Sequence, residues 1–462
     1  MKWWRVVIAF AIAGALGLVA VRFSDAPKAA ASTRAPLVAR DAIDPERLAS
    51  IELDRDGVHY SFERRGTSWW QTKPVLAAVD GWSMRQLATR LLKVESVRVV
   101  DAAAQPGGEA KSLADAGLVP PTARIVLKEE ASAGASPREL TIDLGRRTLA
   151  GRAYARVSGS GPTGSYHVID SALHEFAVER DPKEYRRREV FVDLGEVVDR
   201  IALSSGSNEL VVARQGRGPF RLESPVKSRA DRAQCEELVD ALRRAKSSGF
   251  VADNPVELSA YGLSPAMARL EVEAGGKKQT LLIGDAVSIG AQDRFGMIEG
   301  TSTVVRLPAA VLAPIIPRVE RLIDAVASGV RARDIGGIEI AAGTKRISLR
   351  REVDRWTATR SEQGGTAEAV VGSVETKAVD GLLTALLETR AGSVDIAPFP
   401  ADQSIATVTL LGFANEPIDT VRIARRASDS KLLLENGDGV LRVHGAIELP
   451  ITAEELGFLP KH

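Results

Sequence analysis

Short stretches of alternating apolar and polar residues recur along this chain, and turn residues separate them. Residues 51–53 and 58–62 have the two-residue period of half-buried strands, and the intervening Asp56-Gly57 favours a tight hairpin turn. In residues 81–93 apolar side chains recur every three to four positions, which is typical of an amphipathic helix. Strand-like alternation then returns at residues 123–127, 140–144, 154–157 and 166–169. The pattern predicts an antiparallel sheet with a helix packed on one face.

This order of elements occurs three times. Ile51, Ile201 and Ile338 each open a predicted strand, and an aromatic residue follows each of them at a spacing of 18 or 19 residues. The period of roughly 140 to 150 residues is the length of a domain and far exceeds that of a solenoid repeat. We therefore predict an α+β protein of three tandem related domains, each a mostly antiparallel sheet with a packed helix: residues 45–190, 191–328 and 329–462.

Matched apolar positions connect the three predicted helices to a core. In each copy, two leucines four residues apart are followed by an apolar residue twelve positions after the first. The sets are Leu87, Leu91 and Val99; Leu238, Leu242 and Phe250; and Leu382, Leu386 and Val394. Residues four apart lie on one helix face, so we predict that these side chains are buried.

The aromatic residues have a similar interpretation. Trp70, Phe220 and Trp356 take matched places in the three copies, with Trp69 beside the first of them. One buried aromatic residue per domain is therefore favoured over an exposed platform for a ligand. Trp82 has no counterpart in the other copies and is predicted to be exposed.

The first residues have the pattern of a membrane segment. Residues 6–21 are apolar or glycine without interruption, and two basic residues precede them. With the flanking aromatics, residues 1–23 approach the ~20 residues needed to span a bilayer, with positive charge on the cytoplasmic side. We predict an uncleaved transmembrane signal anchor over residues 1–23 and a flexible linker over residues 24–44. The competing hypothesis is a signal peptide that is cleaved near the small residues 29–31.

Composition and charge narrow the expected partners. The 462 residues carry 61 basic and 60 acidic side chains, for a formal net charge of +1. No overall field would attract nucleic acid, and we expect no nucleic-acid partner. The single cysteine, Cys235, permits neither an intramolecular disulfide nor a thiol cluster for a metal.

Residues that could perform chemistry form no familiar site. The histidines lack the spacing of zinc ligands and are interpreted as packing or solvated residues: His59, His167, His174, His444 and His462. Residues 159–164 have the letters of a dinucleotide fingerprint but precede a predicted strand, so a hairpin loop is favoured. Residues 54–57 and 436–439 resemble the start of a calcium loop but are predicted to be turns. We predict no catalytic, cofactor-binding or metal-binding residue and no cofactor.

Two sets of charged residues leave alternatives open. The sharpest charge run consists of Arg186, Arg187 and Arg188. We predict that it lies on a solvated joint between the first two domains, and the alternative is contact with lipid phosphate or an acidic partner. One aspartate belongs to each predicted helix: Asp80, Asp231 and Asp380. Helix capping is the preferred role, and the alternative is an acid or base in an inter-domain site.

Several stretches within the second copy and just before it resemble a known bacterial family. They are residues 185–188, 201–203, 220–225, 231, 238–242, 261–265, 282–284 and 295–300. The chain resembles the family catalogued as domain of unknown function 4340, most closely over the second copy and least over the third. The resemblance implies a membrane anchor joined to one or more such units, and association with ABC transport systems related to gliding motility. It supplies no active site.

We therefore expect a non-enzymatic structural or adaptor protein of a bacterial envelope assembly, such as an ABC transporter accessory component. It would cross the inner membrane once, with its N-terminus cytoplasmic and the bulk of the chain periplasmic or otherwise extracytoplasmic. Its expected partners are the lipid bilayer, through residues 1–23, and a membrane protein such as an ABC permease. Two alternatives stay open: a glycan or small-ligand binding module, and an envelope enzyme with carboxylates between domains.

Overall fold

The computed structural model describes residues 35–39, 42–101, 112–131, 137–148, 151–158, 164–353, 355–362 and 370–461. The predicted signal anchor and most of the predicted linker lie outside these residues. None of the helices in the described part of the chain combines the length and hydrophobicity that a bilayer crossing requires. The chain divides into an N-terminal unit that ends at Arg187 and a C-terminal unit that begins at Arg188.

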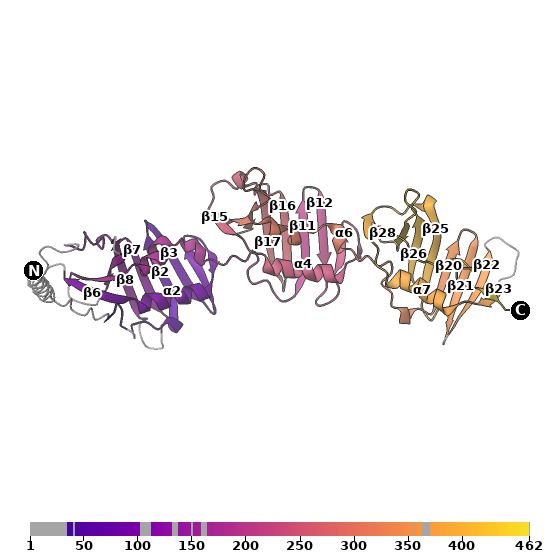
Figure 1. The fold of residues 1–462 in the computed structure, drawn as a ribbon, viewed down its shortest axis with the longest axis horizontal. Coiled ribbons are helices and arrows are strands. Elements are labelled where there is room, and N and C mark those ends of the chain that lie inside the picture. The colour runs from indigo at the N-terminus through magenta and orange to yellow at the C-terminus, as the bar shows by residue number, and fades with distance from the viewer. Residues whose placement is uncertain are drawn as a thin grey trace, which may run out of the picture. The chain divides into compact units, whose positions relative to one another are not determined.

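Three antiparallel sheets make up the described chain, one in the N-terminal unit and two in the C-terminal unit (Figure 1). The first contains β1 (Ala35–Pro36), β2 (Leu48–Arg55), β3 (Val58–Arg65), β4 (Ser68–Lys73), β5 (Ala77–Val79), β6 (Glu95–Asp101), β7 (Ala123–Glu129), β8 (Glu139–Arg147), β9 (Arg152–Val157) and β10 (Ser165–Asp170). The second contains β11 (Val198–Ser205), β12 (Asn208–Ala213), β13 (Arg221–Ser224), β14 (Ser228–Arg229), β15 (Gly249–Asp253), β16 (Ala268–Ala274), β17 (Lys277–Ala286), β18 (Arg294–Ile298) and β19 (Thr303–Leu307). The third contains β20 (Gly337–Ala342), β21 (Lys345–Glu352), β22 (Arg355–Glu362), β23 (Val370–Ser373), β24 (Ser393–Ile396), β25 (Ser404–Leu411), β26 (Pro417–Arg425), β27 (Leu432–Glu435), β28 (Val440–His444) and β29 (Leu459–Pro460).

All three sheets share one strand order. When the nine common strands of each domain are lettered a to i along the chain, their order across the sheet is d-c-b-a-f-g-h-i-e. These strands are β2 to β10 in the first domain, β11 to β19 in the second and β20 to β28 in the third. The extra strand β1 lies beside strand e of the first sheet, and β29 lies beside strand d of the third. The chain thus contains three similar sheet domains, as the repeat predicted.

One helix connects strands d and e in every domain and crosses one face of the sheet (Figure 1). These recurrent helices are α2 (Gly81–Lys93), α4 (Arg232–Arg244) and α7 (Thr376–Leu387). Asp80 and Asp231 cap the first two, since their carboxylates accept the amides of Ser83 and Gln234 at 3.0 Å.

The predicted capping role of Asp380 is wrong. Asp380 lies inside α7 and is exposed, whereas Glu375 holds the N-cap position without a capping hydrogen bond from its side chain. The unpaired amides of a helix belong to its first turn, which begins directly after Glu375. A carboxylate at residue 380 therefore has no free amide to accept.

The six matched leucines are buried in the cores of their domains, as predicted. Leu91, Leu242, Leu382 and Leu386 have no exposed surface. The third member of each set differs: Val394 is buried and Phe250 is half-buried, but Val99 is 55% exposed, so its predicted burial is wrong. Val394 is buried because it packs in the core of the preceding domain, whereas β6 is flanked on its outer edge only at residues 95 and 96 by a described strand, so Val99 stays exposed.

One of the aromatic side chains considered as matched is buried in each domain. Phe220 and Trp356 are 3% and 4% exposed, as predicted. In the first domain Trp69 is buried and Trp70 is only half-buried, so the matched residue is Trp69. Trp82 is 63% exposed, which confirms its predicted place on the surface.

A close approach of two backbones explains a matched glycine in the first two domains. Gly145 and Gly284 lie in strand g, beside the turn that precedes strand f. A Cβ atom at these positions would lie 2.2 Å from the carbonyl oxygen of Ala116 and 2.1 Å from that of Tyr261. Only glycine permits the turn to pack so closely on the strand.

The segment after strand i returns to the helix-bearing face in each domain. In the first domain it forms α3 (Ala172–His174) and the π-helical turn η2 (Glu175–Glu179). In the second it forms α5 (Ala309–Ile315) and α6 (Val319–Leu322). In the third, residues 445–458 contribute apolar side chains to the core without forming a helix. This difference between the domains creates a groove that is described below.

Candidate functional site

The joint between the second and third domains is continuous with the core of the second. Val394 of β24 and Val440 of β28 belong to the third sheet, yet both are buried among core residues of the second domain. Burial of such side chains stabilises the joint by roughly 1.5–3 kcal/mol each. The two domains of the C-terminal unit therefore share apolar packing.

The segment that links these two domains pairs with both of them. Within residues 323–328, Ile323 forms a β-bridge with Ala230, and Val326 forms one with Arg390. The linking segment therefore lies between the domains as an extended, hydrogen-bonded connection.

Asp231 has a second role at this joint. Its carboxylate caps α4 and also accepts a hydrogen bond from the guanidinium of Arg390 in the third domain. Burial alone would raise the pKa of Asp231, but the amide of Gln234 and the Arg390 guanidinium outweigh burial and lower the pKa. At neutral pH the carboxylate is therefore ionised, and each of its two oxygens accepts a hydrogen bond.

Arg442 of β28 is the largest fully buried side chain of the joint. Its guanidinium donates to both carboxylate oxygens of Asp438, at 2.7 and 3.2 Å, and to the carbonyl oxygen of Asp324 at 3.0 Å. The hydroxyl of Ser228 in β14 donates to Asp438 at 2.6 Å. Burial would raise the pKa of Asp438, but the hydrogen bonds from Arg442 and Ser228 lower it. The four residues form a closed polar network across the joint.

The turn predicted at residues 436–439 is confirmed, because it joins β27 to β28. Its part in the joint was not predicted. The alternating stretch of β28 places Arg442 on the same face as Val440, and an arginine at an inward position of a strand is the signal that would have indicated a buried ion pair.

The arginine run is less exposed than predicted. Arg186 is 3% exposed, and its Nε donates to the side-chain oxygen of the buried Gln71 at 2.8 Å. A backbone bridge between Val79 and Arg186 extends the edge of the first sheet and draws the side chain inward. Arg188 is exposed and donates to the carbonyl oxygen of Ser248. The prediction of a solvated run is therefore wrong for Arg186.

The described histidines have separate environments. His59 bonds to Asp54 at 2.7 Å and His167 to the hydroxyl of Ser96 at 3.0 Å. His174 bonds to the carbonyl oxygen of Gly145. Burial lowers the pKa of His167, His174 and His444. No group of three or more potential metal-ligating side chains occurs among the residues that the structure describes.

The loop predicted at residues 159–164 lies mostly outside the described residues. The strands on either side of it, β9 and β10, pair antiparallel. The turn predicted at residues 54–57 joins β2 to β3, with Asp56 and Gly57 at positive φ, as a tight hairpin requires.

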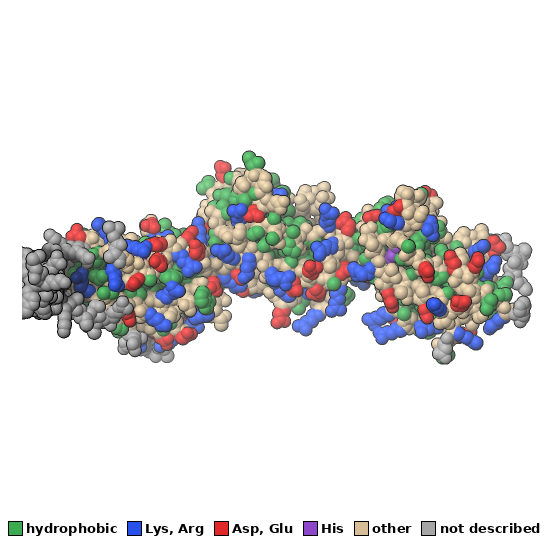
Figure 2. Space-filling model, viewed as in Figure 1, with side chains coloured by type: hydrophobic (Ala, Val, Ile, Leu, Met, Phe, Trp, Pro, Cys, Tyr) green, Lys and Arg blue, Asp and Glu red, His purple; other side chains and the backbone are tan. Residues whose placement is uncertain are grey.

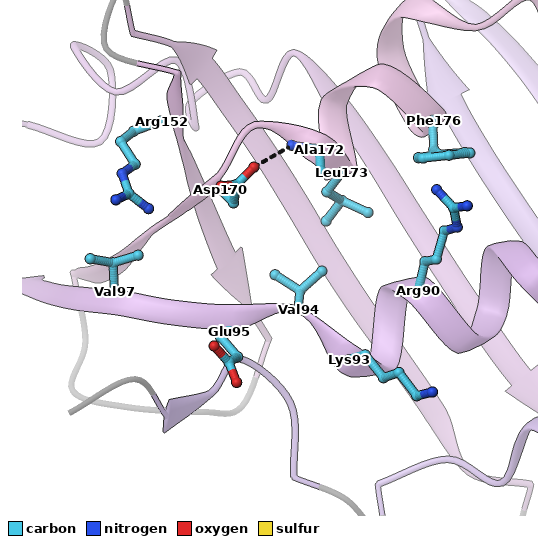
Figure 3. Close-up of a pocket in the computed structure, with 10 residues that line it drawn as sticks. All are labelled: Arg90, Lys93, Val94, Glu95, Val97, Arg152, Asp170, Ala172, Leu173 and Phe176. Atoms are coloured by element: carbon cyan, nitrogen blue, oxygen red, sulfur yellow. Dashed lines mark hydrogen bonds between the residues drawn. The ribbon is translucent and has the colours of Figure 1, made fainter. Parts of the chain in front are cut away.

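A cavity of about 400 Å³ lies in the first domain between the end of α2, the start of β6 and the α3 segment (Figure 3). Its apolar lining includes Val94 and Leu173, and Figure 3 shows Arg152 and Arg90 on opposite sides of them. The guanidinium of Arg90 stacks on the ring of Phe176, 4.0 Å from its centre. The Arg90 guanidinium thus covers one face of the Phe176 ring.

The surface provides no broad region of one charge on the face shown in Figure 2, where basic and acidic side chains are interspersed. This distribution agrees with the formal net charge of +1. Attraction between charges on such a surface is short-ranged and screened by salt.

Asp143 is a buried carboxylate on the first sheet, held between two arginines. Arg124 and Arg156 each donate to it at 2.7 Å, and its side chain is 1% exposed. Burial alone would raise the pKa of Asp143, but the two guanidinium groups outweigh burial and lower it. The ionised carboxylate therefore stabilises the first sheet.

We expect Asp143→Asn to lower the free energy of unfolding of the first domain by about 1–3 kcal/mol at neutral pH. The arginines are 44% and 31% exposed and stay hydrated, which limits the loss. Because the folded pKa lies below the unfolded value of about 3.9, the carboxylate stabilises the fold above that pH. Its contribution is lost as the pH falls through the folded pKa. Urea unfolding at a series of pH values should show a weaker acid dependence for the variant, and equal dependence would contradict this assignment.

Cys235 lies in α4 with no exposed surface, and burial raises its pKa to about 12. We expect its reaction with a thiol reagent at pH 8 to be at least about a hundredfold slower in the native protein than in guanidinium chloride, because the thiolate is the reactive form. With an aromatic disulfide as the reagent, the absorbance of the aromatic thiol that it releases measures the rate. Rapid native reaction would mean that α4 opens readily.

One protein-family model matches a stretch of the chain that spans the joint between the second and third domains. Residues 221–403 match a family model described as Domain of unknown function (DUF4340). The matched residues begin at β13 of the second domain and end in the third domain, and they make up less than half of the chain. The resemblance noted in the second copy thus extends into the third. No curated protein matches the chain.

Two solved structures show weak similarity. They are the crystal structures of the DNA polymerase sliding clamp from Pseudomonas aeruginosa with ligand and of the DNA polymerase III subunit beta from Pseudomonas aeruginosa. Each is 11% identical to this chain and covers 71% of it, with 87% and 89% of the two structures' own chains aligned. The TM-scores of 0.15 and 0.14 carry no argument about fold or function.

Proposed function

We propose that this protein is a non-enzymatic adaptor of a bacterial envelope assembly, such as an accessory component of an ABC transporter. Residues 1–23 would hold it at the inner membrane, with the three domains outside the cytoplasm. The joint between the second and third domains carries the proposal. Asp231 of the second domain pairs with Arg390 of the third, and the buried Arg442 donates to Asp438 and to the linking segment. With the shared apolar packing, these contacts link the two domains, as a scaffold for other proteins requires.

The chemistry of the candidate carboxylates supports this proposal over an enzyme. A general acid at neutral pH needs a raised pKa. For Asp80, burial would raise the pKa, but hydrogen bonds from Ser83 lower it, and the pKa of Asp231 is lowered in the same way. Both carboxylates are committed to helix caps, and Asp380 is an exposed helix residue.

Co-purification tests the adaptor proposal. The full chain, with an affinity tag at its C-terminus, is extracted from host membranes in mild detergent, and the recovered proteins are quantified by mass spectrometry. We expect a permease or ATPase subunit to accompany the full chain and to be depleted when residues 1–23 are removed. Recovery of both forms without an envelope protein above the untagged background would overturn the proposal.

A small-ligand binding module is the second candidate, because the cavity of the first domain has a volume in the range of small-ligand sites. Its lining is apolar between Arg90 and Arg152, and its three basic residues outnumber Glu95 and Asp170, which suits a ligand with an apolar body and an anionic end (Figure 3). Calorimetric titration of the full chain in lipid nanodiscs with dodecanoate and with dodecanol tests this function. We expect dodecanoate to bind and dodecanol not to bind, and we expect Arg152→Ala to weaken the binding of dodecanoate. Equal heats for the two compounds would exclude this function.

A further inference from the structure

The third domain has an open groove where the second domain has a helix. In the second domain, Leu312 and Ile315 of α5 and Leu322 of α6 are buried in the core beneath α4. In the third domain, the segment after β28 contains no helix in the described residues 445–458. A groove of about 560 Å³ lies there, between α7, the ends of β25 to β27 and the non-helical segment.

Equivalent positions of the two recurrent helices show that the groove corresponds to the place of α6. The offset that relates Leu238 to Leu382 also relates Gln234 to Ala378 and Glu237 to Gly381. In the second domain, Gln234 and Glu237 hold α6 through Arg321, whose guanidinium lies 2.6 Å from the amide oxygen and 3.4 Å from the carboxylate.

In the third domain, the matching positions carry alanine and glycine, which are small. Ala378 and Gly381 line the groove, on the face of α7 that corresponds to the Arg321-binding face of α4. The side chains that bind α6 in the second domain are thus replaced by small residues in the third.

Gly381 is not explained by the backbone of α7. It lies inside a regular helix without a positive φ, and a Cβ atom added there would meet nothing within 4 Å. A glycine inside a helix is destabilising by roughly 0.5–1 kcal/mol relative to alanine. The feature that Gly381 does provide is free volume at the wall of the groove.

The lining of the groove suits an amphipathic helix. Its apolar residues come from three strands and from the segment after β28: Ile405, Ile423, Leu432, Ile447, Leu449 and Ile451. Its charged residues are Glu375, Lys377, Arg425, Glu448 and Glu455. An apolar floor bordered by charges of both signs is the surface on which a helix lays its apolar stripe while its polar face stays in water.

We propose that this groove receives an amphipathic helix of a partner protein, in the place that α6 occupies in the second domain. The helix presents apolar residues at i, i+3 or i+4, and i+7 to the groove. The inference rests on the proposed adaptor function for the existence of a partner, and adds the surface that binds it.

Site-specific photo-cross-linking in host membranes tests the occupant. The full chain carries p-benzoylphenylalanine at position 377, an exposed lysine at the rim of the groove, or at the control position 355, an exposed arginine of β22. We expect cross-links to a protein from position 377 only, and mass spectrometry should map them to a segment with apolar residues at helical spacing. Cross-links to lipid, to a second copy of this chain or to a non-helical segment would overturn the inference.

A matched pair of variants provides the second arm. Gly381→Ala and Gly381→Arg both remove the helix glycine, so both should unfold at or above the wild-type temperature. We expect Gly381→Ala to retain the co-purified partner and Gly381→Arg to reduce it at least about tenfold, equivalent to about 1.4 kcal/mol. Equal recovery of the partner with the two variants would overturn the proposed binding in the groove and leave the adaptor proposal intact. Absence of any partner from the wild-type chain would overturn both.

Discussion

Replacing Arg442 with alanine is expected to lower the free energy of unfolding of the C-terminal unit by about 3–5 kcal/mol. The guanidinium has no exposed surface, and the side chain of Asp438 is only 11% exposed. The variant would leave that carboxylate without its cation and the carbonyl oxygen of Asp324 without its donor. Chemical denaturation of the full chain, followed by hydrogen exchange in peptides from β24 to β28, measures the loss.

Two further variants separate the buried charge from general effects of arginine removal. Arg355 is 73% exposed and pairs only with Glu352 among the interactions of the described residues, so Arg355→Ala should cost about 0–1 kcal/mol. The double variant Arg442→Met with Asp438→Asn removes both charges and should recover part of the stability that Arg442→Ala loses. If Arg442→Ala behaves like Arg355→Ala, the polar network does not hold the joint.

Local periodicity was sufficient to predict several main elements of the first domain. The hairpin of β2 and β3 and the bounds of α2 follow from patterns within a few residues, and the structure confirms both. The threefold repeat followed from matched spacings, and the shared strand order agrees with it. These features depend on interactions that are close in sequence or that recur at a fixed period.

The errors arose where burial depends on distant neighbours or on a shift of one residue. Val99 is exposed because no described strand flanks it on the outer edge of β6, and the buried aromatic of β4 is Trp69 and not Trp70. A shift of one residue along a strand exchanges its two faces, and the sequence pattern alone does not fix that shift. Asp380 was assigned to a cap because helix starts are less sharply patterned than helix faces.

The joint and the groove depended on contacts that sequence spacing does not reveal. Arg442 meets the carbonyl oxygen of Asp324 across 118 residues, and Asp231 meets Arg390 across 159. The groove exists because the described residues 445–458 of the third domain form no helix on α7, whereas α6 packs on α4 in the second domain. The sequence offset matches Gln234 with Ala378, but only the folded domains show that their neighbours differ.

The second and third domains are expected to unfold as one cooperative body. Leu242 and Leu386 are fully buried in the respective domain cores, so alanine at either position should cost about 2–5 kcal/mol. Val394 and Val440 of the third sheet pack in the core of the second domain, so loss of that core also removes support from the third sheet. Leu242→Ala should therefore raise hydrogen exchange in β20 to β28 as well as in β11 to β19.

Hydrogen exchange of the full chain, read by mass spectrometry, distinguishes this cooperative body from two independently folding domains. A loss of 3 kcal/mol shared by both domains would raise exchange of their most protected amides by about a hundredfold, since about 1.4 kcal/mol corresponds to tenfold. Ile289→Ala removes a side chain that is fully exposed and should change neither domain. If Leu242→Ala raises exchange only in β11 to β19, the shared packing at Val394 and Val440 does not couple the domains, and the joint is a flexible connection instead of a rigid one.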